Sequence, residues 1–236
     1  MQQNGNVKVL EISLPHGRSA EIGVVGPDDG EAVLYFHSPS ASGEELEGAA
    51  SAAEQLQLRL LSVRRPSIAC DEPAQFVETV ASDIASVAKA LALKRPALLG
   101  WSGGAPYLLA TSARLGPDVA SIHLVSPVPG PLTGADAVPD QSPRLRQVAN
   151  TTATSPWVSS PAVLRDYQAV AAPWTFDVES ITQPVTVWAP TEDQIVPPHL
   201  IEHLARRLPN ATIVPVPGEH DWLIENWRTV LGRLQG

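Results

Sequence analysis

The sequence predicts an α/β fold in which a mostly parallel central sheet carries helices on both faces. From about residue 30 onward, short runs that are apolar throughout alternate with longer segments of helical character. Strands without polar alternation are typical of a parallel sheet that is covered on both sides. The chain has 236 residues and is 44% hydrophobic, which suits a single domain of this class.

The first two strands are expected to form an antiparallel hairpin before the parallel sheet begins. Residues 7–14 and 20–25 are predicted strands, and the Pro-His-Gly-Arg sequence at 15–18 is the predicted turn between them. Further strands are expected at 32–36, 58–63, 97–101, 122–125, 185–188 and 212–216. Helices are expected at 42–56, 73–93, 103–115, 198–208 and 221–234.

One long segment, 127–184, interrupts this alternation. It is rich in proline and holds a large share of the chain's few aromatic residues. Excursions of this length inside a compact domain are usually functional or disordered, and the aromatic side chains oppose disorder. We therefore expect residues 1–236 to form one domain in which 127–184 is a proline-rich cap insertion over the edge of the sheet. The alternative is a packing insertion that does not touch substrate.

Composition opposes several classes of partner. The net charge of −9 disfavours binding to nucleic acid or to an anionic membrane surface, because both attract basic proteins. No apolar run approaches the roughly 18 residues that span a bilayer, and the amino terminus lacks the features of a signal peptide. The single cysteine, Cys70, fits a reducing compartment. We expect a cytoplasmic protein, monomeric or homodimeric, that acts on a small molecule and binds neither nucleic acid nor membrane.

Residues 100–104, Gly-Trp-Ser-Gly-Gly, form a G-x-S-x-G sequence around Ser102. The serine falls between the strand expected at 97–101 and the helix expected at 103–115. A sharp strand-to-helix turn lifts the hydroxyl clear of the sheet, and it needs small residues beside the serine. Amide groups at the helix N-terminus stabilise negative charge that develops there. Ser102 is the predicted nucleophile, and the alternative is a glycine-rich turn without a catalytic role.

A serine hydroxyl is a poor nucleophile without a neighbouring base. His220 follows the last expected strand, and Asp193 follows the strand expected at 185–188. In this chain order the histidine takes the serine proton and the acid accepts the far imidazole hydrogen. The predicted catalytic residues are therefore Ser102, His220 and Asp193, with Glu192 as the alternative acid.

No metal or organic cofactor is expected. His199, Glu202 and His203 match the H-x-x-E-H zinc pattern on an expected helix. Nothing else nearby suggests a third ligand, so surface histidines are the favoured interpretation. Cys70 lies on a loop without a local histidine, and it is interpreted as a loop residue and not as a nucleophile.

Three stretches resemble the α/β-hydrolase superfamily: 100–104, the Glu-Asp-Gln-Ile-Val-Pro sequence at 192–197, and Gly-Glu-His at 218–220. The branch of proline iminopeptidases, cofactor-free haloperoxidases and small esterases is the most similar, and the resemblance runs from about residue 32 to the C-terminus. It implies an α/β-hydrolase fold and a serine hydrolase without cofactors. It also implies an oxyanion hole, half of it from Gly103 and half from a His-Gly-x-Pro sequence after an early strand.

The sequence departs from that pattern after the strand expected at 32–36. His37 aligns with the family histidine, but Ser38 and Pro39 follow it where glycine and an amide donor are usual. Proline has no N–H, and losing one oxyanion donor typically costs about 10²–10³ in rate. An amide of Ser38 or Ser40 is therefore expected to replace the missing donor.

The favoured prediction is a serine hydrolase that cleaves an ester, thioester or amide of small to medium size through an acyl-enzyme. His37, Trp101, Trp157 and Trp174 are the expected substrate-binding residues, and packing against the sheet is the alternative for Trp101. Two other classes stay open. One is a non-hydrolytic enzyme of the same fold that cyclises, epimerises or transfers acyl groups, and the other is a ligand-binding protein without turnover. The departure at Pro39 and the proline-rich cap motivate the first of these.

Overall fold

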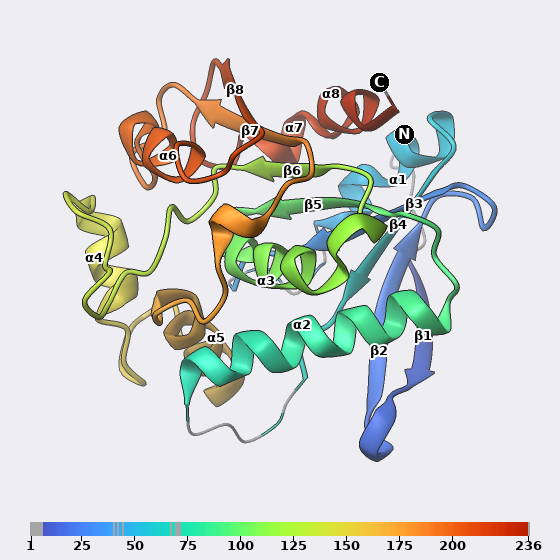
Figure 1. Ribbon diagram of the computed structural model, residues 1–236, viewed down its shortest axis with the longest axis horizontal. Helices are drawn as coiled ribbons and strands as arrows, with labels where there is room; N and C mark the ends of the chain where they lie inside the picture. The colour runs from blue at the N-terminus through green and yellow to red at the C-terminus, as the bar shows by residue number, and fades with distance from the viewer. Residues whose placement is uncertain are drawn as a thin grey trace.

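A computed structural model describes residues 7–39, 41, 43, 45–66, 68 and 72–235. Its described part contains an eight-stranded sheet with the order β1-β2-β4-β3-β5-β6-β7-β8 (Figure 1). The strands are β1 (Lys8–Ser13), β2 (Ser19–Val25), β3 (Glu31–Phe36), β4 (Leu58–Val63), β5 (Ala97–Trp101), β6 (Ile122–Val125), β7 (Val185–Pro190) and β8 (Ala211–Val216). From β4 to β8 across the sheet every pairing is parallel, so the carboxyl ends of these strands meet at one edge.

Strands β1 and β2 form the predicted antiparallel hairpin. The register runs from Lys8 opposite Val24 to Ser13 opposite Ser19, and β2 then pairs antiparallel with β4. Side chains of β2 alternate between exposed and buried over most of its length, as expected where one face of a strand meets solvent. Strands β5 and β6 are almost entirely buried, as expected of a parallel sheet that is covered on both faces.

Helices cover both faces of the sheet. They are α1 (Leu46–Gln55), α2 (Pro73–Ala90), α3 (Ala105–Leu115), α4 (Pro143–Ala149), α5 (Pro161–Ala171), α6 (Pro198–Ala205), α7 (Trp222–Glu225) and α8 (Trp227–Gly232). The buried side chains of α2, α3 and α6 belong to the core on one face. Those of α1, α7 and α8 belong to the core on the other face. The predicted α/β fold class is confirmed.

The connection from β6 to β7 contains two helices that were not predicted from the sequence, α4 and α5. Each begins with a serine followed by proline, and the hydroxyl oxygens of Ser142 and Ser160 accept hydrogen bonds from the amides of Leu145 and Val163. Such serine N-caps, with proline at the next position, favour helix initiation. Helix α5 packs against α2 and α4. Figure 1 shows α4 and α5 at the end of the sheet toward which β5 and β6 point.

The single helix expected at 221–234 is wrong, because the chain breaks at Asn226 into α7 and α8. Asn226 leaves helical geometry with φ −123° and ψ 22°, and its side chain donates to the carbonyl of Trp222 at 2.8 Å. The break lets two indoles pack in different places. Trp222 stacks on Trp188, whereas Trp227 is buried edge-on against Tyr35. Within the described residues, no helix has both the length and the apolar character needed to cross a bilayer.

Candidate active site

Ser102 occupies the turn between β5 and α3. Its φ of +52° is unusual for a residue with a side chain and marks the sharp turn that raises the serine hydroxyl above the strand ends. A short 3₁₀ turn, Ser102–Gly104, leads directly into α3. The nucleophile predicted from the sequence therefore sits at the N-terminal end of a helix.

The two outer glycines of the motif lie close to neighbouring elements. A Cβ at Gly104 would lie 2.1 Å from the carbonyl oxygen of Phe36, and one at Gly100 would lie 2.9 Å from the end of the Leu108 side chain. A side chain at Gly104 would require the backbone of β3 to move, whereas at Gly100 the Leu108 side chain would have to shift. Gly104 is therefore the stricter requirement of this turn.

Ser102, His220 and Asp193 form one chain of hydrogen bonds. The serine Oγ lies 2.8 Å from His220 Nε2, and His220 Nδ1 lies 2.8 Å from Asp193 Oδ2. With Asp193 ionised, Nδ1 carries the hydrogen and Nε2 accepts from the serine hydroxyl. The three residues come from the loops after β5, β7 and β8, whose carboxyl ends share one edge of the sheet.

Asp193 is held for this role by its own loop. Its side chain is buried, and Oδ1 accepts hydrogen bonds of 2.8 Å from the amides of Ile195 and Val196. Glu192, the alternative acid, is exposed. Its backbone amide donates to the carbonyl of Gly218 at 2.9 Å, which ties the acid loop to the histidine loop. The structure thus brings Asp193, and not Glu192, against His220.

Trp101 also fixes the histidine loop. Its indole Nε1 donates to the backbone carbonyl of His220 at 3.1 Å, and the two rings lie 6.1 Å apart. Trp101 also lines the cavity at Ser102. Trp101 therefore has both of the roles considered from the sequence, because it borders the cavity and also packs within the fold.

A cavity of about 110 Å³ lies over Ser102 and His220. Its walls are mainly apolar and come from the triad loops and from α4 and α5. The lining residues from the β6–β7 connection are Val128, Arg144, Leu145, Val148, Tyr167 and Val170. From the sequence, aromatic residues of this segment were expected at the site. Arg144, Leu145 and Val148 were not expected there, because no helix was predicted in this part of the chain.

The loop after β3 forms another wall of this cavity. Ser38 and Pro39 line it beside Gly103, and a Cβ on Gly103 would meet the Pro39 ring at 2.6 Å. The proline that replaces an amide donor therefore packs directly on the residue after the nucleophile. Ser40, the other predicted source of an oxyanion donor, lies outside the described residues.

The prediction that His37 binds substrate is not supported by its position. The side chain is buried, its Nδ1 lies 2.9 Å from the carbonyl oxygen of Ser38, and it does not line the cavity over Ser102. The backbone carbonyl of His37 accepts a hydrogen bond from Arg65. His37 therefore acts within the loop and not at the cavity wall.

Burial lowers the pKa of His37 from 6.5 to about 3, and the charge of Arg65 adds to this effect. Below pH 6.5 the unfolded chain therefore binds a proton that the folded chain rejects, so the free energy of unfolding falls as pH falls toward 3. From pH 6.5 to 4.5 this contribution is about 2 kcal/mol. We expect the His37→Asn variant to lose that part of the pH dependence in urea unfolding measured at both pH values. If the free energy of unfolding of His37→Asn fell between these two pH values by as much as that of the unmodified protein, His37 would not be a buried, neutral imidazole.

Trp157 and Trp174, the cap tryptophans predicted to bind substrate, do not line the cavity. Trp157 lies beneath Arg144, whose guanidinium carbon is 4.6 Å from the ring centroid, and meets Tyr167 edge-on. It therefore supports two lining residues from behind. Trp174 stacks on Phe176 and packs against the main core. Sequence alone did not distinguish a wall of the cavity from the layer behind it.

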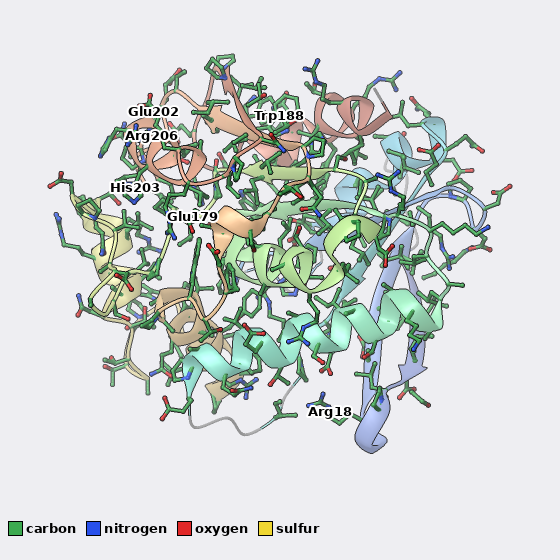
Figure 2. The ribbon with its side chains drawn as sticks, viewed as in Figure 1. Arg18, Glu179, Trp188, Glu202, His203 and Arg206 are labelled. Atoms are coloured by element: carbon green, nitrogen blue, oxygen red, sulfur yellow. The ribbon has the colours of Figure 1, made fainter. Side chains whose placement is uncertain are left out.

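The H-x-x-E-H residues lie on α6 at the outer edge of the molecule. His199 and Glu202 are exposed, and Glu202 pairs with Arg206 at 3.9 Å; Figure 2 shows Glu202, His203 and Arg206 beside one another. Among the described residues, no three histidine, cysteine, aspartate or glutamate side chains are grouped closely enough to hold a metal ion. Cys70 lies outside the described residues.

Solved structures share this architecture over nearly the whole chain. A 2-hydroxy-6-oxo-6-phenylhexa-2,4-dienoate hydrolase from Rhodococcus sp. strain RHA1 matches with a TM-score of 0.75 at 14% identity, covering 98% of both chains. The esterase RhEst1 from Rhodococcus sp. ECU1013 matches at 0.70 and 19%, covering 96% of this chain and 97% of its own. An alpha/beta hydrolase fold protein from Nakamurella multipartita matches at 0.66 and 19%, covering 97% and 100%. The chain has the α/β-hydrolase fold.

The α/β-hydrolase fold accounts for where the site lies, at the carboxyl edge of the parallel strands. Comparison of the sequence with protein-family models and with curated proteins gives no match. The structural neighbours named above include hydrolytic enzymes, and their identity to this chain is low. The narrower resemblance to proline iminopeptidases, cofactor-free haloperoxidases and small esterases stays a prediction.

Proposed function

We propose that this α/β-hydrolase-fold protein is a serine hydrolase that cleaves esters or related acyl compounds of small to medium size. The observation that carries the proposal is the hydrogen-bond chain from Ser102 through His220 to Asp193, with its serine end at an apolar cavity. Esterases and hydrolases among the structural neighbours support the same class of reaction.

In the first half of the reaction, Ser102 Oγ attacks the substrate carbonyl while its proton passes to His220 Nε2. Asp193 stabilises the imidazolium that forms and keeps Nδ1 protonated. The negative charge on the carbonyl oxygen is stabilised by the backbone amide of Gly103 at the helix N-terminus. An amide of Ser38 or Ser40 is the proposed second donor. The bond to the leaving group then breaks, and His220 returns the proton to that group.

In the second half, water attacks the acyl-enzyme. His220 Nε2 takes one proton from the water, and the new oxygen–carbon bond produces a second oxyanion. When the bond from carbon to Ser102 Oγ breaks, His220 gives that proton to the serine oxygen and a carboxylic acid leaves. At the end of the cycle Ser102, His220 and Asp193 are back in their starting protonation states, so this cycle requires no cofactor.

We further propose that the 127–184 segment is a cap over this site. Helices α4 and α5 provide much of the apolar wall opposite Ser102, and such a wall limits both substrate size and water entry. Acyl transfer or cyclisation is the alternative fate of the same acyl-enzyme, in which a bound nucleophile attacks in place of water.

A fluorophosphonate probe tests the activated serine without knowledge of the substrate. We expect stoichiometric labelling at Ser102, located by peptide mass mapping, and a labelling rate at least about 10²-fold lower in His220→Ala. His199→Ala is the matched control, because it removes an exposed histidine that does not contact the site. Labelling at another residue, or an undiminished rate in His220→Ala, would overturn the proposed triad. Hydrolysis and acyl transfer are then separated by the products formed from an activated ester with and without added alcohol.

A further inference from the structure

We propose that Arg144 recognises a carboxylate on the substrate, so that the preferred substrates are esters whose short acyl group ends in an acid. This inference rests on the proposed hydrolase function of the same cavity and names its substrate class.

Arg144 lies on α4 at the wall of the cavity over Ser102. Apart from the imidazole of His220, it is the basic side chain among the lining residues, which include no carboxylate. Most of the other lining residues are apolar, among them Leu145, Val148 and Val170. Arg144 therefore brings positive charge to the wall of the cavity that also holds the reacting serine.

The guanidinium is positioned but not neutralised. It lies over the face of Trp157, with 4.6 Å from its carbon to the ring centroid, and one N–H donates to Gln147 Oε1 at 2.9 Å. No carboxylate of the described residues pairs with it. Because guanidinium has five N–H donors, Arg144 keeps donors for a planar, two-oxygen ligand.

The net charge of the chain opposes the binding of anions in general. With 25 acidic and 16 basic residues other than histidine, the protein as a whole repels anions. An anionic substrate therefore needs a local cation, and the half-buried Arg144 supplies one at the wall of this cavity. Arginine matches a carboxylate in two parallel hydrogen bonds.

The cavity has a volume of about 110 Å³ and opens to solvent, so its volume does not fix the length of the acyl group. An acyl chain of about five carbons is short enough to place its far end at the cavity wall and is the length chosen for the test. A glutaryl ester has this length and ends in a carboxylate. Its neutral counterpart of equal chain length is a pentanoyl ester.

The decisive comparison uses mono-p-nitrophenyl glutarate and p-nitrophenyl pentanoate, with Ser102→Ala measuring the background hydrolysis of each. We expect Arg144→Gln to lower kcat/KM for the glutarate about 10- to 100-fold and to leave the pentanoate within about twofold. Arg146→Gln is the matched control, since Arg146 is an exposed residue of the same helix that does not line the cavity. It is expected to change neither ester. An equal loss for both esters in Arg144→Gln, or no loss for either, would overturn the inference.

A binding measurement keeps this inference separate from the proposed function. Glutaramate and pentanamide are titrated into Ser102→Ala protein and followed by ligand-observed NMR. Binding of glutaramate that exceeds that of pentanamide and is lost on adding Arg144→Gln supports carboxylate recognition, even if neither ester is hydrolysed by the unmodified protein. Equal binding of the two amides, or binding that survives the arginine substitution, refutes it. Failure of fluorophosphonate labelling alone would instead refute the hydrolase mechanism.

Discussion

Replacing Asp193 with asparagine is expected to lower kcat about 10⁴-fold. The aspartate Oδ2 accepts the Nδ1 hydrogen of His220 at 2.8 Å. An asparagine amide placed there donates, so the imidazole takes the tautomer that carries hydrogen on Nε2 and can no longer accept the proton of Ser102. Folding should change little, because the asparagine oxygen can still accept from the Ile195 and Val196 amides that Asp193 Oδ1 binds now.

The matched control for this variant is Glu192→Gln. It makes the same change of charge one residue earlier in the chain, on an exposed side chain that does not contact His220. We expect kcat on an activated ester to stay within about twofold of the unmodified protein. Urea unfolding of both variants tests whether a loss of rate reflects a loss of folded protein. A larger effect at Glu192 than at Asp193 would reverse the assignment of the acid.

The strands and the order of the triad were predictable from sequence because each depends on local signals. Strands β5 and β6 match their predicted ranges 97–101 and 122–125, since short apolar runs bounded by turn residues leave few alternatives. Once the strands are assigned as parallel, the loops that follow them meet at one edge of the sheet. This topology, the G-x-S-x-G sequence and the chain order serine, acid, histidine together predicted Ser102, Asp193 and His220.

The β6–β7 connection was predicted less well, because no strand–helix unit was recognised in this proline-rich segment. Two of them, Pro143 and Pro161, instead occupy the first turn of a helix, where the missing N–H costs nothing. The Ser-Pro pairs at 142–143 and 160–161 were the available signals. Without α4, Arg144 had no predicted place at the cavity, and the tryptophans of the segment were the natural but incorrect choice for its lining.

Contacts between residues far apart in the sequence could not be predicted from the spacing of residue types. Arg65 follows β4 and Asp166 lies on α5, 101 residues later, yet their side chains form a buried ion pair. The same arginine donates to the carbonyl of His37 and lies over the ring of Tyr107, 4.3 Å from its centroid. Periodicity shows which side of an element is buried, but it does not show which charged residue from another element will meet it.

This network leads to the second large prediction, that Arg65→Met lowers the free energy of unfolding by about 3–5 kcal/mol. The substitution leaves the Asp166 carboxylate buried without its cation. Tyr107, which donates its hydroxyl hydrogen to Asp166, gives only partial compensation. Burial raises the pKa of Tyr107 well above its ordinary value, so this phenol remains a neutral donor. Urea unfolding near pH 7 measures the change.

Two further variants separate the buried ion pair from the general effect of losing an arginine. Arg114 pairs with Glu78 on the surface, and Arg114→Met is expected to cost less than about 1 kcal/mol because solvent screens that pair. In the double variant Arg65→Met/Asp166→Leu no charge is left unpaired in the interior, so much of the lost stability should return. This double variant also keeps the prediction testable if Arg65→Met alone does not fold. Additive losses in the double variant would show that Arg65 acts through its bond to His37 and its contact with Tyr107, and that the charge of Asp166 is not what makes it necessary.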